Sequence, residues 1–326
     1  MTAATRIHML GAGAMGSLFG FLLAERGRRV TLIDTRRELL DAVTHGGLTL
    51  EEDGEARTLA DIAVQADPAL AGEADMVLVF VKAGDTDAAV RSVFPCLRPD
   101  TLVLTLQNGL GNGEAVMRAV RTRAAEEGRE ALQGFVPAAG VTACGATMLV
   151  PGRVRFAGRG ETVVGALDAG MHAGALARLE DFCALLQRAG LPARISPAIR
   201  SQIWTKLLVN AGINAVTALC RVPNGAMAAN PEAAAVLRDA VREGMAVAAA
   251  LGIALDVPDP VAHTMRIAEA TAANRSSMLQ DILAGRPTEI GVINGAIADL
   301  AEESGIPAPV NATLARLVRV RERARE

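Results

Sequence analysis

Short apolar runs and segments with helical periodicity alternate along the first hundred residues. Apolar runs without a polar residue, such as 76–79 (MVLV), are typical of strands that are buried on both faces. Glycine follows several of the helical segments, as at Gly27. The pattern predicts strands at 6–10, 30–33, 76–81 and 102–106, shorter strands at 48–51 and 58–64, and helices at 14–26, 38–44 and 85–93. Such an alternation predicts a parallel sheet with helices on both faces.

The pattern changes after about residue 140. Short strands between Gly and Pro turns are predicted at 140–148, 152–156, 161–164 and 193–195, and an antiparallel extension of the sheet suits them. From residue 197 the pattern is almost wholly helical, with proline at helix starts and glycine after helix ends. The predicted helices are 198–219, 231–251, 260–272, 276–284, 287–304 and 309–323. We therefore expect an α/β domain over residues 1–196 and an all-α C-terminal domain over residues 197–326.

Two uncharged apolar runs require a separate explanation. The run 7–24 resembles the apolar part of a signal peptide, but its four glycines fit a strand, a glycine turn and a helix better. The run 131–152 is long enough to span a bilayer, but Pro137, Pro151 and its glycines would leave backbone groups unpaired in lipid. We interpret it as a loop and a buried strand, and expect a soluble, cytoplasmic protein with no membrane partner.

Composition narrows the possible chemistry. The 326 residues suit about two domains, and 33 Lys and Arg against 36 Asp and Glu give a net charge of −3. This balance gives no electrostatic footprint for nucleic acid. The chain has no tyrosine, which excludes the Tyr–Lys chemistry of short-chain dehydrogenases. Its four His and four Cys lie far apart without zinc-ligand spacing, so we predict no metal site and interpret the cysteines as reduced thiols.

A glycine-rich loop connects the first predicted strand to the first predicted helix. It matches the pattern G-x-G-x-x-G, and its position between strand and helix is the context that makes this short pattern informative. Gly11 allows a tight turn, Gly13 lets a pyrophosphate approach the backbone, and Gly16 lets the helix pack on the strand. We predict a dinucleotide site here rather than a purely structural turn, formed by Gly11, Ala12, Gly13, Ala14, Met15 and Gly16.

Asp34 stands at the end of the second predicted strand. A carboxylate there typically accepts hydrogen bonds from the adenosine ribose hydroxyls and repels the 2′-phosphate of NADP. We therefore favour NAD(H) as the cofactor. Two alternatives stay open: Arg36 and Arg37 follow and could bind that phosphate, and Asp34 could merely cap the next segment.

Lys82 and Asn108 each follow a predicted buried strand. The carboxyl ends of parallel strands are where open α/β sheets bind ligands, so we predict cofactor contacts for both residues. The alternatives are a solvated lysine at position 82 and a turn-forming Asn-Gly at position 108.

Three polar residues recur on an otherwise apolar predicted helix, in the segment 203–214 (IWTKLLVNAGIN). Lys206, Asn210 and Asn214 are spaced i, i+4 and i+8, so they form one stripe along the helix. The stripe could face solvent, but two amides and one cation solvate a helix face poorly. We therefore favour an interior polar site.

Motifs in both halves of the chain resemble those of one enzyme family, the ketopantoate reductases (2-dehydropantoate 2-reductases). The matching segments are GAGAMG, VKAGDTDAAV, LTLQNGLGN, IWTKLLVNAGINAVTAL followed by Asn224-Gly225, NRSSMLQD, GRPTEI and ING. The resemblance covers nearly the whole chain. It implies a Rossmann domain followed by an all-helical domain, an active site in the cleft between them, and a homodimer.

The resemblance also implies roles for individual residues. Lys206 is expected to be the general acid and Glu289 its charged partner, with Asn108 near the nicotinamide. Substrate contacts are expected from Asn210, Asn214, Asn224 and Asn274, and from Ser277, which would bind the substrate carboxylate. The set is physically coherent, because an ammonium near a ketone oxygen stabilises the charge that develops there and donates the proton.

The expected reaction is hydride transfer between a nicotinamide cofactor and a 2-oxo or 2-hydroxy acid, with reduction of ketopantoate to pantoate in pantothenate biosynthesis as the first expectation. Asp34 and Thr35 stand where NADP-dependent members usually have an apolar residue and Arg, which favours NAD(H) and leaves NADP(H) open.

Two other functions fit parts of the sequence. A dehydrogenase of another hydroxy acid could share the fold, but the segments around Ser277 and Glu289 argue against the β-hydroxyacid dehydrogenases. A non-catalytic dinucleotide-binding regulator is a further alternative, against which the retention of both Lys206 and Glu289 argues.

Overall fold

The computed structural model describes residues 5–324 and divides the chain into two compact units. The α/β unit comprises Met1–Gln107 and Asn112–Ile199, and the helical unit comprises Asn108–Gly111 and Arg200–Glu326. The units differ from two contiguous domains in one segment, the loop 108–111. The loop belongs to the helical unit because Leu110 donates its backbone N–H to the Val292 carbonyl at 2.9 Å.

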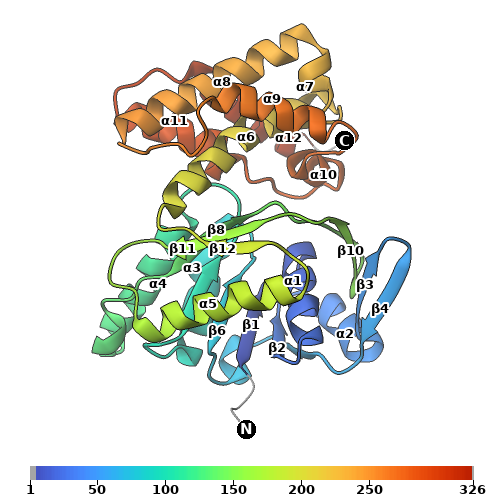
Figure 1. Ribbon diagram of the computed structural model, residues 1–326, viewed down its shortest axis with the longest axis vertical. Coiled ribbons are helices and arrows are strands. Elements are labelled where there is room, and N and C mark those ends of the chain that lie inside the picture. The colour runs from blue at the N-terminus through green and yellow to red at the C-terminus, as the bar shows by residue number, and fades with distance from the viewer. Residues whose placement is uncertain (1–4, 325–326) are drawn as a thin grey trace. The chain divides into compact units, whose positions relative to one another are not determined.

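An eight-stranded sheet forms the centre of the α/β unit (Figure 1). Its strand order is β12-β11-β8-β7-β6-β1-β2-β5, and the strands from β8 to β5 are parallel. β11 is antiparallel to β8, and β12 is parallel to β11. This topology confirms the predicted parallel sheet with an antiparallel extension. The bounds are β1 Arg6–Leu10, β2 Arg29–Ile33, β5 Ala63–Gln65, β6 Met76–Val79, β7 Leu102–Thr105, β8 Ala138–Thr142, β11 Thr162–Ala166 and β12 Ala193–Ile195.

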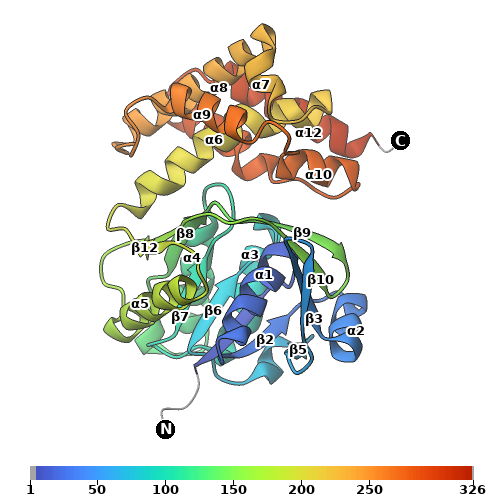
Figure 2. The same ribbon diagram turned by 45° about the vertical axis from the view of Figure 1, so that its right-hand side comes forward.

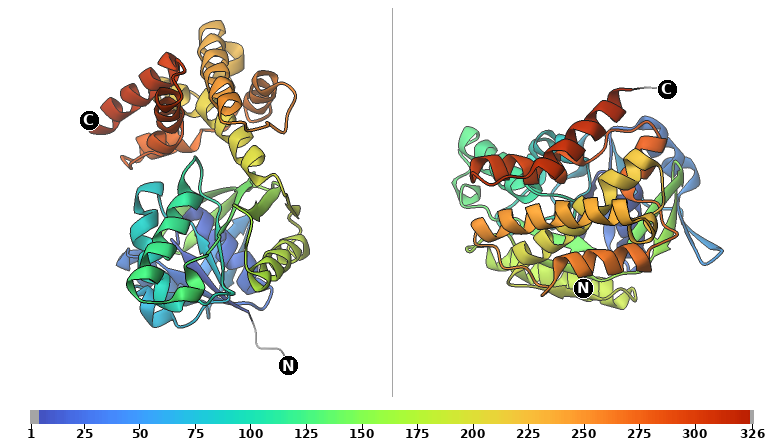
Figure 3. Two further views of the ribbon diagram at one scale, coloured as in Figure 1. Left: turned by 90° about the vertical axis from the view of Figure 1, so that its left-hand side faces the viewer. Right: turned by 90° about the horizontal axis from the view of Figure 1, so that it is seen from above.

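Helices cover both faces of this sheet (Figure 3). Along β6, Met76 and Leu78 contribute to the core beneath α1 and α5, and Val77 and Val79 contribute to the core beneath α3 and α4. This alternation is the period of two that a strand imposes, and both faces are buried. The helices are α1 Ala14–Glu25, α2 Arg37–Gly46, α3 Thr86–Val93, α4 Asn112–Glu126 and α5 Ala173–Arg188.

A second, four-stranded sheet packs against α1 (Figure 2) and was not predicted. Its order is β4-β3-β10-β9, with bounds β3 Leu48–Glu52, β4 Glu55–Leu59, β9 Gly145–Val150 and β10 Arg153–Gly158. Two predicted strands were therefore wrong. The segment 58–64 is divided between β4 and β5, and 140–148 between β8 and β9. β8 ends where Cys144 N–H donates to Thr142 Oγ1 at 3.2 Å, a local side-chain bond that competes with the strand ladder.

The second unit is built from helices around α6 (Figure 1). Leu207, Leu208 and Ala211 of α6 share one apolar core with residues of the later helices. Asn230 and Asp259 accept backbone N–H bonds at the starts of α8 and α9, where proline is the first helical residue. The bounds are α6 Ile199–Cys220, α7 Ala226–Ala229, α8 Pro231–Ala250, α9 Pro260–Ala270, α10 Ser277–Leu283, α11 Asn294–Glu303 and α12 Pro309–Arg323.

The predicted helix 287–304 is shorter than expected. Its first part is a loop and a 3₁₀ turn, Ile290–Val292, and α11 begins at Asn294. The cause is the backbone at Ile293, whose φ of −109° and ψ of −98° are not helical. Glu289 therefore lies just before the 3₁₀ turn rather than on a continuous helix.

A buried amide pair joins α6 to three helices around it. Asn294 Nδ2 donates to Ala211 O and to Asn311 Oδ1, each at 3.0 Å, and Asn311 Nδ2 donates to Ala240 O at 3.0 Å. Both amides are fully buried. Because breaking these donated bonds would leave buried N–H groups unpaired, the two Nδ2 groups fix α8, α11 and α12 against α6.

The apolar runs noted in the sequence have ordinary places in this fold. Residues 7–24 form β1, the glycine turn and α1, and 131–152 contain a loop with β8 and β9, as interpreted. Among the described residues, α6 has the length and apolar composition to cross a membrane, but 67% of its most apolar window is buried within the protein. A core helix meets the same criterion, so this property is weak evidence for a membrane span.

Candidate active site

The three glycines of the loop between β1 and α1 have different surroundings. Gly11 has a φ of +98°, and a Cβ there would lie 2.7 Å from Val81 N. A Cβ on Gly16 would lie 1.9 Å from the Gly11 carbonyl oxygen. By contrast, a Cβ on Gly13 would meet no described atom within 4 Å. Gly11 and Gly16 are therefore needed for local packing, whereas Gly13 borders open space.

The start of α1 is suited to an anion. Its N-cap residue, Gly13, has no side chain to cap the helix, and the first helical bond runs from Ser17 N–H to Gly13 O at 2.8 Å. The N–H groups of Ala14, Met15 and Gly16 precede that bond. With the open space beside Gly13, these donors and the helix dipole fit the pyrophosphate of a dinucleotide.

Asp34 connects the end of β2 to the glycine loop. Its Oδ2 accepts the Ala12 N–H at 2.8 Å, and its Oδ1 accepts the Arg36 N–H at 3.0 Å. The Arg36 guanidinium binds the same carboxylate in a fork, with Nε at 2.9 Å from Oδ1 and Nη2 at 2.7 Å from Oδ2. Burial alone would raise the pKa of Asp34, but the bonds and charge of Arg36 outweigh it and hold the pKa below its ordinary value.

Gln107, which sequence reasoning missed, holds together the segments that follow β6 and β7. Its Nε2 donates to Val81 O at 2.6 Å and to Thr86 Oγ1 at 2.8 Å. Its Oε1 accepts the Thr105 hydroxyl at 2.8 Å. These bonds fix the segment that contains the exposed Lys82. A long amide directly after a buried strand was the available signal.

Asn108 lies in the helical unit, against Glu289. Its Nδ2 donates to Glu289 Oε2 at 3.1 Å. The next residue, Gly109, has a φ of +85°, and a Cβ there would lie 2.4 Å from the Val292 carbonyl oxygen. The loop 108–111 therefore approaches the 3₁₀ turn so closely that glycine is required. The structure thus brings together one residue predicted to bind cofactor and one predicted to be catalytic.

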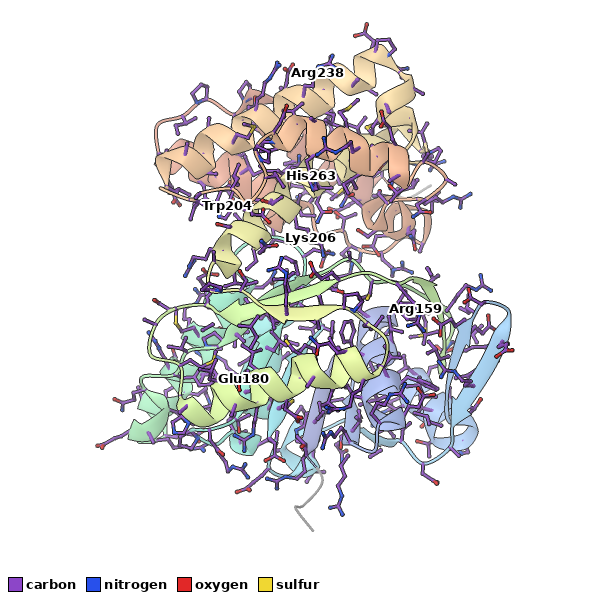
Figure 4. All side chains as sticks on the ribbon, viewed as in Figure 1. Arg159, Glu180, Trp204, Lys206, Arg238 and His263 are labelled. Atoms are coloured by element: carbon purple, nitrogen blue, oxygen red, sulfur yellow. The ribbon has the colours of Figure 1, made fainter. Side chains whose placement is uncertain are left out.

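Lys206, Asn210 and Asn214 lie along one side of α6, as their spacing requires. Figure 4 labels Lys206 on this helix, near Trp204. Lys206 and Asn210 are half-buried, and Asn214 is 6% exposed. The neighbouring Leu207 and Leu208 are buried, so the stripe lies at the border of the apolar core.

Asn224, just before α7, is hydrogen-bonded to Asn274, which lies between α9 and α10. The Asn224 N–H donates to Asn274 O at 2.9 Å, and Asn224 Nδ2 donates to Thr271 Oγ1 at 2.9 Å. The Asn224 side-chain oxygen is buried and has no hydrogen-bond partner among residues 5–324. A buried amide oxygen without a partner is costly, and a ligand donor would satisfy it.

Ser277 is exposed and is the first residue of α10. The preceding Ser276 is buried and caps this helix by accepting the Leu279 N–H at 3.1 Å. The Ser276 and Thr217 hydroxyls lie 2.7 Å apart, and the Thr217 hydroxyl also contacts the Asn214 carbonyl at 3.0 Å. Two buried hydroxyls thus connect the start of α10 to the Asn214 turn of α6.

The described part of the chain contains no group of three or more His, Cys, Asp and Glu residues that could hold a metal ion. Apart from the glycine loop, the candidate site residues carry amides, hydroxyls, two ammonium groups (Lys82 and Lys206) and two carboxylates (Asp34 and Glu289). Such a set suits recognition of a polar organic acid and proton transfer to it.

Family models match both units. The model "Ketopantoate reductase PanE/ApbA" matches residues 7–169, and its C-terminal counterpart matches residues 198–322. The 2-dehydropantoate 2-reductase of Halobacterium salinarum is 37% identical over 324 residues, covering 98% of this chain and 99% of that protein. The enzyme of the same name from Pyrococcus horikoshii is 35% identical over 318 residues, covering 97% of each chain.

Two solved structures are similar to this chain over nearly its full length. A PanE/ApbA family ketopantoate reductase from Ralstonia eutropha is 34% identical with a TM-score of 0.83, covering 98% of this chain and 99% of that one. The ternary structure of D-mandelate dehydrogenase with NADH and anilino(oxo)acetate is 27% identical with a TM-score of 0.86, at the same coverage.

Proposed function

The chain belongs to the ketopantoate reductase family, and from this premise we propose that it reduces the 2-oxo acid ketopantoate to pantoate with a nicotinamide cofactor. The hydrogen bond from Asn108 to Glu289 is the observation that carries the proposal. It joins two residues 181 positions apart to which the family resemblance gives roles in one reaction. Full-length similarity to 2-dehydropantoate 2-reductases supports the same substrate class.

The residues of the α/β unit would hold the cofactor. The N–H groups at the start of α1 suit the pyrophosphate, Asp34 suits the adenosine ribose, and Lys82 follows β6 at the carboxyl edge of the sheet. When bound, the reduced nicotinamide supplies the hydride that the carbonyl carbon of the substrate receives.

Lys206 then has the role of general acid. An ammonium near the carbonyl oxygen stabilises the negative charge that develops there, and donates the proton that completes the hydroxyl group. We assign Glu289 as the charged partner of Lys206, and the Asn108 amide orients the Glu289 carboxylate. This chemistry needs neither a metal nor a histidine.

Amides and a hydroxyl of the helical unit would bind the substrate. We assign this role to Asn210, Asn214, Asn224, Asn274 and Ser277, with Ser277 at the substrate carboxylate. Burial of Asn214 and the unsatisfied oxygen of Asn224 support the assignment, because each is a polar group held at an otherwise apolar core.

A second candidate is an NAD-dependent dehydrogenase of another hydroxy acid. Two observations favour it: Asp34 at the end of β2, and a TM-score of 0.86 with a D-mandelate dehydrogenase solved with NADH. For either reaction we propose NAD(H) as the favoured cofactor, with NADP(H) as the alternative.

Steady-state kinetics distinguishes the candidates. NADH and NADPH oxidation would be measured with ketopantoate, phenylglyoxylate and a series of aliphatic 2-oxo acids. A kcat/KM for ketopantoate at least about tenfold above the others supports the first candidate, and a preference for phenylglyoxylate or another acid supports the second. Dinucleotide binding without turnover of any 2-oxo acid would contradict both and indicate a regulator.

We also propose that the protein is a cytoplasmic homodimer, as the family resemblance implies. Light scattering of the purified protein tests the assembly: a monomer mass at micromolar concentration would contradict it. Fractionation of the source cells tests the location.

A further inference from the structure

The Asp34 carboxylate has a complete set of hydrogen-bond donors within the protein. A carboxylate accepts about four hydrogen bonds through its two oxygens. Oδ2 accepts from Ala12 N and Arg36 Nη2, and Oδ1 accepts from Arg36 N and Arg36 Nε, all within 3.0 Å. Ribose hydroxyls can therefore reach Asp34 only by displacing a donor that already occupies it.

The guanidinium of Arg36 is the donor that can leave. The Ala12 and Arg36 N–H groups belong to the backbone, whereas the Arg36 side chain is 56% exposed and the Asp34 side chain 9% exposed. Released from Asp34, the guanidinium would be solvated, and the ribose hydroxyls would replace its two hydrogen bonds to the largely buried carboxylate. Binding of the ribose diol to Asp34 thus competes with Arg36.

The same ion pair changes how the site treats a 2′-phosphate. A lone carboxylate would repel it, but the Asp34–Arg36 pair has no net charge. Of about five guanidinium N–H donors, only those on Nε and Nη2 engage Asp34. The others suit a phosphate oxygen, and arginine binds phosphate with directed hydrogen bonds.

We propose that Arg36 selects the cofactor: it leaves Asp34 when the ribose hydroxyls of NAD(H) bind, and it binds the 2′-phosphate of NADP(H). The proposal rests on the proposed function only in that a dinucleotide occupies the glycine loop. Arg36 thereby reduces the difference in affinity between NAD(H) and NADP(H) that Asp34 alone would produce. The protein therefore binds both cofactors.

Cofactor titrations of Arg36→Ala and Arg29→Ala, without any 2-oxo acid, test the proposal. Arg29 is exposed and begins β2, at the opposite end of the strand from Asp34, so its variant removes one surface charge of the same unit away from the glycine loop. In Arg36→Ala the Kd of NADH should fall about threefold to tenfold, because the competing donor is absent. The Kd of NADPH should rise about tenfold or more. In Arg29→Ala both values should stay within about twofold of the wild type.

Weaker NADH binding in Arg36→Ala would overturn the proposal, because Arg36 would then orient Asp34 for the ribose. An unchanged ratio of the two Kd values would overturn it as well. If Arg36→Ala does not fold, Arg36→Lys decides: lysine keeps the charge without the fork, so NADH binding should tighten while NADPH binding weakens by less than about tenfold.

The titration also separates this proposal from the proposed reaction. The expected shift in Kd with no turnover of any 2-oxo acid would contradict the reaction and leave the role of Arg36 intact. Turnover of ketopantoate with an unchanged Kd ratio would do the reverse.

Discussion

Alanine substitutions at Gly13 and Gly16 should separate cofactor binding from folding within a single turn of α1. At Gly16 the added methyl would lie 1.9 Å from the Gly11 carbonyl oxygen and 3.1 Å from the Gly11 carbonyl carbon. At Gly13 it would meet no described atom within 4 Å, and the extended backbone there (φ −67°, ψ −167°) suits any residue. Gly16→Ala should therefore disturb the packing of α1, whereas Gly13→Ala should affect only the binding of a ligand.

The distances set the expected magnitudes. A carbon and a carbonyl oxygen ordinarily approach to about 3.3–3.6 Å, so Gly16→Ala requires α1 and the loop to separate by roughly 1.5 Å. Overpacking of this kind costs about 3 kcal/mol, which lowers Tm by about 6–12 °C in a unit of this size. Gly13→Ala should lower Tm by about 2 °C at most, since only a modest helix-cap preference is lost.

Thermal unfolding by circular dichroism and NADH titration would be carried out on both variants. Gly13→Ala should weaken NADH binding by about tenfold or more, because its methyl occupies the space through which the phosphates approach. Wild-type NADH affinity in Gly13→Ala would refute the assignment of the phosphate site. A wild-type Tm in Gly16→Ala would refute the packing argument.

Three further predictions concern catalysis and stability. Lys206→Ala should lower kcat about 10²- to 10⁴-fold with unchanged NADH affinity, because the proposed general acid is removed. Burial alone would raise the pKa of Asp75, but the Arg6 hydrogen bonds outweigh it and hold the pKa well below its ordinary value. The folded protein therefore loses stability as pH falls below about 4. Asp75→Asn should lower the free energy of unfolding by about 1–3 kcal/mol at pH 7 and weaken the dependence of stability on acid pH. Urea unfolding at pH 7 and pH 3 measures both effects. Thr217→Val should raise KM for the 2-oxo acid with little change in kcat, because Ser276 loses the hydroxyl at 2.7 Å that positions α10.

Each of these predictions has a contrary outcome and two have matched controls. A kcat near the wild-type value in Lys206→Ala would disprove the general-acid role. Asp61→Asn alters an exposed carboxylate of the same unit, so equal acid sensitivity in this variant and in Asp75→Asn would contradict the ion-pair argument. Thr264 is fully buried and its hydroxyl bonds within its own helix to Pro260 O, so a KM change in Thr264→Val equal to that in Thr217→Val would remove the special role of the Ser276 contact.

The central sheet could be predicted from the sequence because its strands are buried on both faces. A run such as that of β6 has no polar position, and a helix follows it after a short turn. The second sheet could not be predicted in the same way. β3 pairs in parallel with β10, Thr49 opposite Arg153, and nothing local specifies a partner so far along the chain. Its strands are also short and partly exposed, so they lack the continuous apolar run that marks β6.

The candidate site likewise contains residues that local sequence patterns indicate and residues that they do not. The glycine loop and Asp34 form a local motif with a fixed relation to a strand and a helix, so spacing alone indicated the dinucleotide site. Glu289 has no local pattern of that kind, and only the family resemblance pointed to it. Gln107 was missed because its hydrogen bonds go to Val81 and Thr86, on another strand end and helix. Side chains that act through tertiary contacts have little signature in a single sequence.

The loop 108–111 determines how this protein can be dissected or recombined. Since that loop belongs to the helical unit, the chain passes from one unit to the other three times, after Gln107, Gly111 and Ile199. A fragment that begins at Arg200 would lack the Asn108 amide that binds Glu289 and the Leu110 N–H that binds Val292. After proteolysis at Ile199, the loop 108–111 of the first product would still hold the second product through its hydrogen bonds to Glu289 and Val292. A chimera of two relatives should therefore take residues 108–111 and 200–326 from the same parent.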